Sequence, residues 1–213
     1  LSSPGVDIIW RLFWGSLIRH CNLSMVNLHI VNKDIPDCVM NKIVRQTRSH
    51  SVNFYSLPRV IQENDADVNY TCDYMMKNCG HHQWACISHF DMWFKRDWLT
   101  FARNLIADDV AVIGNHCPIM LVNRTAYAHS IIKFMTTNIR PRGDTGMGLQ
   151  REMEELGWKV LYYPEFNDSK DEKDPHGAHS YFHHIGGGGS DYDEVHLDMM
   201  RDLCDKMVTE LGY

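Results

Sequence analysis

Apolar residues recur along this chain at two spacings, one typical of helices and one typical of strands. In residues 7–21 the apolar side chains lie three or four positions apart, which predicts an amphipathic helix. The same spacing predicts further helices at 38–47, 71–79, 96–106, 125–137, 148–156 and 193–211. Short apolar runs between polar or glycine positions predict strands at 26–31, 52–57, 82–87, 110–113, 119–122 and 158–163.

The order of these elements predicts the fold class. Strands alternate with helices through most of the chain, which favours an α/β/α sandwich with a mixed, mainly parallel sheet. A chain of 213 residues can form one sizeable core but hardly two, so residues 1–213 are expected to be a single domain. The first expected element is a helix, which is consistent with a first strand that is missing from this sequence.

Two stretches have no clear periodicity and are expected to be loops. Residues 63–69 are polar. Residues 165–190 are first charged, then rich in histidine and finally rich in glycine. The glycines at 186–189 favour a flexible loop that can close over a ligand.

Composition and charge narrow the function classes. With 44% hydrophobic and 23% charged residues, the chain has the balance of a soluble globular protein. Its net charge of -6 argues against a protein that coats nucleic acid. No apolar run approaches the ~20 residues that span a bilayer.

Cysteine usage indicates a reducing compartment. The chain has seven cysteines and no Cys-x-x-Cys pair, so buried free thiols and a cytoplasmic location are expected. Tripeptides of the Asn-x-Ser/Thr type occur at Asn22, Asn69, Asn123 and Asn167. They leave a secretory lumen as the alternative, if the chain is a trimmed fragment.

A candidate metal site follows the strand expected at 82–87. His89 and Asp91 stand two residues apart at its carboxyl end, where open α/β sheets bind ligands. An imidazole and a carboxylate there can hold a divalent metal, which would neutralise a phosphorylated substrate. The alternative is a hydrogen-bonded pair that caps the next helix.

A candidate general base lies before the helix expected at 148–156. Asp144 belongs to the segment Gly143-Asp144-Thr145-Gly146. A carboxylate in this position can deprotonate an attacking hydroxyl. It can equally cap the helix, because aspartate is among the best capping residues and the helix dipole favours its charge.

Histidines, aromatic residues and arginines supply further candidates. Residues 174–184 contain four histidines, which either add a ligand to the strand-end site, hold a separate zinc or form a polar surface. Trp93 and Trp98 follow His89 and Asp91 and either pack in the core or stack on the face of a sugar or base. Residues that either contact phosphate or form a solvated surface are Arg124, Arg140 and Arg142.

Taken in order, these pieces resemble glycosyltransferases of the GT-A fold, of the family-two type. In that family a strand-end Asp-x-Asp motif holds Mn²⁺ or Mg²⁺ against a nucleotide-sugar diphosphate. Here His89-Phe90-Asp91 stands at that position, with histidine in place of the first aspartate. The family's glycine-ended strand is matched by Val112-Ile113-Gly114, and the element that carries the base is matched by residues 143–146. The segment with a C-terminal metal-binding histidine is matched by residues 183–187. Gly143 replaces the acidic residue that precedes the base in the family.

The resemblance implies a set of functional residues. The metal ligands would be His89, Asp91 and either His184 or His183, and the base would be Asp144. The donor nucleotide would contact Asn32, Asp34, Asp73, Asn78 and Gly114. The acceptor side would include Trp93, Trp98 and Arg142.

The implied activity is transfer of a sugar from a UDP- or GDP-linked donor to an acceptor hydroxyl, with Mn²⁺ or Mg²⁺ and with inversion at the anomeric carbon. The acceptor would be a glycan, a protein, a small molecule or, with less support, a modified DNA base. Two alternatives remain from the residues alone. One is a metal-dependent phosphoesterase or nucleotidyltransferase, and the other is a nucleotide-sugar-binding module without catalysis.

Overall fold

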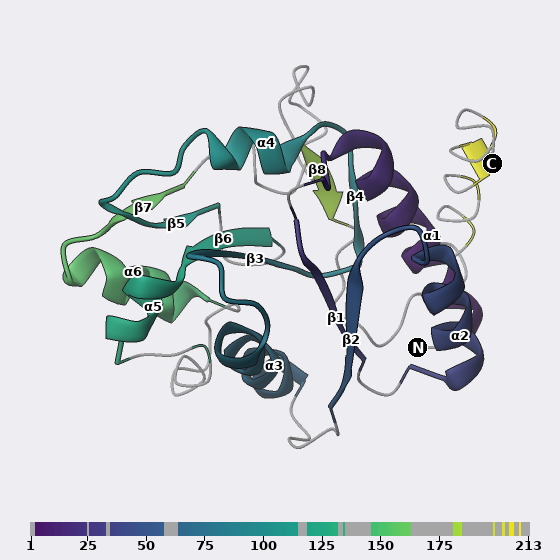
Figure 1. Ribbon diagram of the computed structural model, residues 1–213, viewed down its shortest axis with the longest axis horizontal. Helices are drawn as coiled ribbons and strands as arrows, with labels where there is room; N and C mark the ends of the chain where they lie inside the picture. The colour runs from purple at the N-terminus through teal and green to yellow at the C-terminus, as the bar shows by residue number, and fades with distance from the viewer. Residues whose placement is uncertain are drawn as a thin grey trace.

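The computed structural model has a central four-stranded sheet between two layers of helices (Figure 1). Residues 3–24, 26–32, 35–57, 64–114, 119–131, 134, 146–162, 181–184, 198, 202, 205–206 and 209 are described.

The strands are β1 (Leu28–Asn32), β2 (Val52–Ser56), β3 (Trp84–Ser88), β4 (Met92–Phe94), β5 (Val110–Ile113), β6 (Ile119–Asn123), β7 (Lys159–Leu161) and β8 (Phe182–His184). The helices are α1 (Ser3–His20), α2 (Asp37–Gln46), α3 (Asn64–Asn78), α4 (Trp98–Arg103), α5 (Arg124–His129) and α6 (Met147–Glu155). No helix in the described part of the chain is both long and apolar enough to cross a membrane.

The central sheet has the strand order β3-β6-β5-β7. Strand β6 is antiparallel to both of its neighbours, and β7 is parallel to β5. Two further pairs stand outside this sheet: β1 with β2 in parallel, and β4 with β8 in antiparallel orientation. The expectation of a mixed sheet is confirmed, although parallel pairings do not dominate among the described strands.

Each face of the central sheet supports a hydrophobic core, because successive side chains of a strand point to opposite faces. On β6, Ile119 and Leu121 belong to one core, while Met120 and Val122 belong to the other. The first core also contains apolar residues of α1, α2, α4, β4 and β8. The second contains apolar residues of α3, α5 and α6, so the sheet lies between two helical layers.

Local hydrogen bonds explain where two of the helices begin. The carboxylate of Asp97 accepts a hydrogen bond from the Thr100 backbone N–H at 3.0 Å, which caps α4. The side chain of Asn123 accepts one from the Thr125 N–H at 2.9 Å, which caps α5. Asn123 also donates to the carbonyl of Val110 at 3.2 Å, so this cap is tied to β5.

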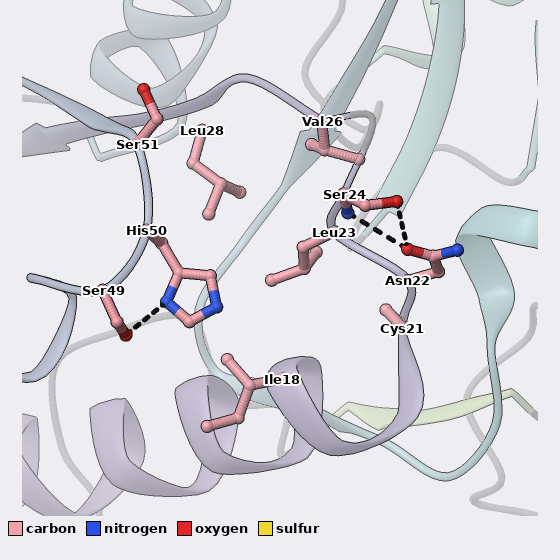
Figure 2. Close-up of a pocket in the computed structure, with 10 residues that line it drawn as sticks. All are labelled: Ile18, Cys21, Asn22, Leu23, Ser24, Val26, Leu28, Ser49, His50 and Ser51. Atoms are coloured by element: carbon pink, nitrogen blue, oxygen red, sulfur yellow. Dashed lines mark hydrogen bonds between the residues drawn. The ribbon is translucent and has the colours of Figure 1, made fainter.

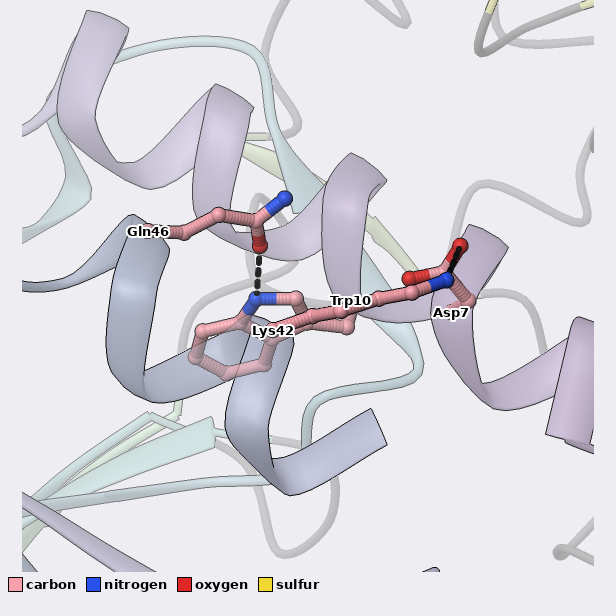
Figure 3. A network of polar contacts seen from close by, with 4 residues as sticks. All are labelled: Asp7, Trp10, Lys42 and Gln46. Atoms are coloured by element: carbon pink, nitrogen blue, oxygen red, sulfur yellow. Dashed lines mark hydrogen bonds and ion pairs between the residues drawn. The ribbon is translucent and has the colours of Figure 1, made fainter. Parts of the chain in front are cut away.

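Helix α1 packs against α2 through aromatic and polar contacts (Figure 3). The indole N–H of Trp10 donates to Oε1 of Gln46 at 2.7 Å, and within α1 the ring of Trp10 stacks on Trp14 with centroids 5.6 Å apart. Lys42 Nζ lies 3.2 Å from the Asp7 carboxylate. Because this ion pair is largely solvated, the aromatic burial contributes more to the contact.

Several boundaries differ from the sequence-based expectation. Helix α3 begins at Asn64, so most of the polar stretch 63–69 is helical rather than a loop. Strand β8 lies within the predicted loop 165–190, and β4 was not expected. Helix α5 ends at His129 instead of continuing to 137. The residues described within the predicted C-terminal helix, at 198, 202, 205, 206 and 209, are helical.

Candidate functional site

Three strands end at the same edge of the central sheet. Strands β3 and β5 run in the same direction because each is antiparallel to β6, and β7 is parallel to β5. The carboxyl ends of all three strands therefore meet at one edge. The pair His89 and Asp91 follows β3, and Gly114 follows β5. This edge is where a ligand is expected in an open α/β sheet.

Met120 of β6 lies at the centre of this edge. It is paired with Ile87, the residue before the last one of β3. A methyl group added at Gly114 would lie 2.9 Å from the Ile119 carbonyl oxygen and 3.4 Å from Cα of Met120. One added at Gly146 would lie 2.6 Å from Cε of Met120. Met120 thus brings the end of β3, the end of β5 and the start of α6 together.

Both glycines are required by the backbone as well as by this close approach. Gly114 has φ +110° and Gly146 has φ +89°, a region that other residues rarely adopt. The amide of Gly114 donates to the Leu161 carbonyl at 3.0 Å, which fixes the end of β5 against β7. The chain can therefore turn sharply at both positions and keep its backbone close to the sheet edge.

His89 and Asp91 lie beside each other in the turn between β3 and β4. Nδ1 of His89 is 3.9 Å from Oδ1 of Asp91, and the side chains are 26% and 16% exposed. The hydroxyl of Ser88 donates to the His89 carbonyl at 2.7 Å, which holds the backbone of the turn. Oδ1 of Asp91, the oxygen near Nδ1 of His89, is itself buried, and the pair directly follows β3 as its position in the sequence predicted.

The spacing of this pair is wider than neighbouring ligands of one octahedral ion require. Such ligands, bonded at about 2.1 Å, lie about 3.0 Å apart, so the 3.9 Å separation would have to close by about 0.9 Å for both groups to bind one ion side by side. An imidazole and a carboxylate are a donor set that Mn²⁺ accepts. Among the side chains that the structure describes, no group of three or more metal-ligating residues occurs. A complete site would therefore need a further ligand.

Strand β8 brings the C-terminal histidines next to this turn in the backbone register. His184 pairs with Met92 and His183 with Trp93, so both lie within two residues of Asp91 across the ladder. The carbonyl of Tyr181 accepts from the Lys95 N–H at 2.8 Å, which extends the contact. Two segments that are about 90 positions apart in the sequence thus meet beside the candidate metal site.

Asp144 lies outside the described residues, and so do Asp34, Arg140 and Arg142. The residue that follows the segment 143–145 can be placed, since Gly146 is the N-cap of α6 and lies against Met120. Gly146 occupies the N-cap position of α6 and makes no side-chain capping hydrogen bond. The predicted base precedes that glycine by two positions in the sequence.

The predicted donor residues fall at different places. Asn32 ends β1, beside Ser56 at the end of β2, and its Oδ1 accepts from the Ile35 N–H at 3.0 Å. Asp73 is only 5% exposed and accepts hydrogen bonds from Tyr127 and Phe134, which favours a structural role. Asn78 ends α3 and leads into the amino end of β3, so it lies at the sheet edge opposite to His89. This placement does not support a shared donor site for Asn78.

The arginine and tryptophan candidates need two corrections. Trp98 is 0% exposed and belongs to the first core, so its ring has no accessible face on which a sugar could stack. Arg124 donates hydrogen bonds to the carbonyls of Met76 and Cys79, and therefore caps the end of α3 rather than contacting phosphate. Trp93 of β4 is half-buried beside Asp91 and remains a candidate for the acceptor side.

Two polar residues of α6 were missed in the sequence. Gln150 is 1% exposed and donates to the Gly114 carbonyl at 3.2 Å, which ties α6 to the end of β5. Glu152 is 7% exposed and accepts from Ile131. A signal was present, since both stand beside the apolar residues Leu149 and Met153 on a short helix.

A separate pocket of about 440 Å³ lies among the end of α1 and the starts of β1 and β2 (Figure 2). It is lined by hydroxyl, amide and imidazole groups over an apolar base, including Ser24, Ser49, His50 and Leu28. Asn22 and Ser24 are hydrogen-bonded to each other at its rim. The pocket is at the amino ends of β1 and β2 and contains neither His89 nor Asp91, so it is not part of the candidate site.

Comparisons with known proteins agree with the fold. No protein-family model matches the chain, and no curated protein sequence matches it. The chain is similar to the crystal structure of the glycosyltransferase GlyE of Streptococcus pneumoniae TIGR4, with a TM-score of 0.60 and 12% identity over 97% of this chain. It is also similar to the bifunctional glycosyltransferase WbbM, with a TM-score of 0.60 and 11% identity over 94% of this chain.

These similarities establish the architecture. The chain spans 60% of the GlyE chain and 47% of the WbbM chain, so both contain regions without a counterpart here. The mixed α/β sandwich is therefore the GT-A-like fold that the order of the sequence motifs predicted.

Proposed function

We propose that the chain is a metal-dependent glycosyltransferase that moves a sugar from a nucleotide-sugar donor to an acceptor hydroxyl. The observation that carries the proposal is the convergence at one sheet edge. There the pair His89 and Asp91 follows β3, and Gly114 follows β5. Gly146 begins α6, and both glycines lie against Met120 of β6. Similarity in fold to two glycosyltransferases supports the same class of activity.

In this proposal, His89 and Asp91 hold Mn²⁺ or Mg²⁺ together with His183 or His184. A divalent ion bound there supplies positive charge that stabilises the departing nucleoside diphosphate. Asn32 and Asp34 contact the nucleotide, and Gly114 lets the backbone approach it closely. Trp93 and Arg142 are proposed to contact the acceptor.

Asp144 is proposed as the general base. It removes the proton from the acceptor hydroxyl, whose oxygen attacks the anomeric carbon while the bond to the diphosphate breaks. Attack from the face opposite to the leaving group inverts the anomeric configuration. The order of motifs supports this role, because the segment with Asp144 leads directly to Gly146 and α6.

The first test measures nucleotide binding by calorimetry with UDP and GDP, in the presence and absence of Mn²⁺. We expect metal-dependent binding of one nucleotide, and we expect Asp91→Asn to abolish it because a metal ligand is lost. Asp108→Asn is the control, since Asp108 is exposed and lies in the turn before β5. If Asp91→Asn binds the nucleotide with Mn²⁺ as tightly as the unmodified chain does, Asp91 is not a metal ligand.

The second test measures metal-dependent turnover of a nucleotide-sugar panel. Asp144→Asn should keep nucleotide binding and lower turnover by about 10²–10⁴-fold, the usual contribution of a general base. Full activity in this variant would show that another group is the base. Release of inorganic phosphate or nucleoside monophosphate without sugar transfer would instead indicate a phosphoesterase, and binding without turnover would indicate a binding module.

A further inference from the structure

A buried hydroxyl of α1 reaches the edge of β4. Ser16 is 0% exposed, and among the side chains described on α1 it is the only polar one that is fully buried. Its Oγ donates to the Phe13 carbonyl at 3.0 Å within the helix and accepts from the Phe94 N–H of β4 at 2.9 Å. The rings of Phe13 and Phe94 lie 5.9 Å apart, so apolar packing accompanies this polar contact. One side chain thus joins α1 to β4, which lie next to each other in the fold (Figure 1).

The contact with Ser16 closes the second edge of β4. Successive N–H groups of a strand point to opposite edges. On one edge β4 pairs with β8, and the Lys95 N–H continues that ladder by donating to the Tyr181 carbonyl at 2.8 Å. On the other edge the Phe94 N–H is buried, since Phe94 is 2% exposed, and a buried N–H without an acceptor is costly. Ser16 supplies the acceptor that a neighbouring strand would otherwise provide.

Strand β4 in turn carries one end of the turn that holds the candidate metal site. His89 and Asp91 lie between β3 and β4, and Met92, the first residue of β4, directly follows Asp91. The Ser88 hydroxyl, at the end of β3, lies 2.7 Å from the His89 carbonyl oxygen and 3.1 Å from Sδ of Met92. The turn is therefore closed across its base by Ser88, and it is anchored to α1 through the contact of β4 with Ser16.

This anchoring matters for metal binding because the two candidate ligands have to approach each other. Nδ1 of His89 and Oδ1 of Asp91 are 3.9 Å apart, which is wider than adjacent ligands of one ion. If the backbone of the turn is fixed, the approach needs only rotation of the side chains. If β4 is free to shift, binding of the ion must also order the backbone, and that cost lowers the affinity.

We propose that Ser16 is a positioning residue for the candidate metal site. By holding β4 through the Phe94 N–H, it keeps the turn with His89 and Asp91 in one place before an ion binds. This inference rests on the proposed function, because it takes His89 and Asp91 as metal ligands. Ser16 touches neither the ion nor the substrates and acts through β4. Groups that orient the ligands of a metal typically change its affinity by about 10–100-fold when they are removed.

The test compares Ser16→Ala, which removes the acceptor, with Ser16→Thr, which keeps a hydroxyl. Thr47→Val is the matched control, because Thr47 is also buried and its hydroxyl donates within α2, to the Ile43 carbonyl at 3.0 Å. The first readout needs no metal and follows hydrogen exchange of the peptide that contains β4 by mass spectrometry. We expect the Phe94 amide to exchange about tenfold faster in Ser16→Ala, because its acceptor is lost. Neither Ser16→Thr nor Thr47→Val should show this change.

The second readout is the Kd for Mn²⁺ alone, measured by calorimetry. Ser16→Ala should raise this Kd about tenfold, and Ser16→Thr should keep it within about threefold of the unmodified chain. Thr47→Val should leave the Kd unchanged although its Tm falls. A purely structural role of Ser16 would lower the Tm of Ser16→Ala and Thr47→Val alike and would leave the Mn²⁺ Kd of both variants unchanged.

The results separate this inference from the proposed function. Failure of the unmodified chain to bind Mn²⁺ would refute the metal assignment, and the positioning role with it. If the unmodified chain binds Mn²⁺ and folded Ser16→Ala binds it equally tightly, the metal assignment stands and the positioning role is overturned. An unchanged exchange rate of Phe94 in Ser16→Ala would overturn it as well.

A further variant keeps the test decisive if Ser16→Ala does not fold. Ser16→Cys nearly preserves the size of the side chain and replaces the oxygen with a weak acceptor. We expect it to raise the Mn²⁺ Kd as Ser16→Ala would, and an unchanged Kd in this variant would equally overturn the proposal.

Discussion

His89 is the residue at which the candidate metal site departs from the paired carboxylates of the family it resembles. An imidazole nitrogen is a softer ligand than a carboxylate oxygen, and it suits Mn²⁺ better than Mg²⁺, which prefers an all-oxygen shell. Nδ1 of His89 lies 3.9 Å from the Asp91 carboxylate, so both groups can influence which metal ion the site prefers.

We therefore predict that His89→Asp shifts metal preference towards Mg²⁺. In the unmodified chain, the nucleotide should bind more tightly with Mn²⁺ than with Mg²⁺. The ratio of the nucleotide Kd with Mg²⁺ to the Kd with Mn²⁺ should fall by on the order of tenfold in the variant, as is typical of changes around a metal. Calorimetry with each metal measures the ratio, and His81→Asp is the control because His81 is exposed and lies before β3. An unchanged ratio would mean that residue 89 is not a ligand.

Single residues also show what the sequence could and could not predict about the site. The position of His89 and Asp91 directly after β3 was predicted, because a polar pair after an apolar run indicates a strand end. Trp98 was assigned to the acceptor side from its position in the sequence, whereas its burial depends on α1 and on the central sheet. Residue type indicates chemistry, but exposure is set by distant segments.

At the scale of elements, strand ends marked by glycine were predicted well. Strand β5 has the expected bounds 110–113, and Gly114 ends it with a positive φ. Strands β4 and β8 were not predicted, since each has only three residues and is stabilised by pairing with the other. A short strand whose partner is about 90 positions away leaves no local signal in the sequence.

The conformation of Gly114 leads to a prediction about stability. Gly114→Ala should lower the free energy of unfolding by about 1–3 kcal/mol, because alanine would be strained at φ +110° and its methyl group would lie 2.9 Å from the Ile119 carbonyl oxygen. Gly15→Ala is the matched control, since Gly15 is inside α1 with nothing within 4 Å. It should stabilise the chain by about 0.5–1 kcal/mol. Urea unfolding measures the free energy of unfolding of both variants. Equal changes in Gly114→Ala and Gly15→Ala would contradict the prediction.

His29 links the side-chain layer of β1 to β2. Its Nδ1 is 3.2 Å from the Tyr55 hydroxyl of β2. Burial lowers the pKa of His29, and the charges of Arg124 and His82 lower it further. The folded state therefore favours the neutral ring more strongly than the unfolded state does.

This difference predicts acid sensitivity. In the unfolded chain a histidine has a pKa of about 6.5, so the unfolded state takes up the proton first as the pH falls. The contribution of His29 to stability should be complete above that pH and should decrease below it. His29→Asn should lose less stability than the unmodified chain between pH 7.5 and 5.5 in urea unfolding. His81→Asn, at an exposed position, should lose as much as the unmodified chain, and an equal loss in His29→Asn would contradict the prediction.

At the scale of the whole molecule, the two cores share one sheet. Cys21 lies in the core with α1, α2 and α4, and Cys72 lies in the core with α3, α5 and α6. Both faces of β6 are buried. If one helical layer separated from the sheet, the apolar side chains on that face of β6 would be exposed to water, and the sheet that supports the other core would be weakened. The sequence-based expectation of a single domain can therefore be tested as cooperative unfolding of the two cores.

We predict that Cys21 and Cys72 become reactive together as urea is raised. Burial raises the pKa of Cys21 to about 11 and of Cys72 to about 12, so in the folded chain at pH 8 both should react with iodoacetamide at least about 100-fold more slowly than an exposed thiol. Cys38 is exposed and serves as the internal control, labelled at every urea concentration. Mass spectrometry of tryptic peptides gives the extent of labelling at each cysteine. Coincident midpoints for Cys21 and Cys72 are expected from one cooperative unit, because loss of the shared sheet exposes both thiols at once. Midpoints that differ would show that the two helical layers unfold independently and that the chain is not one domain.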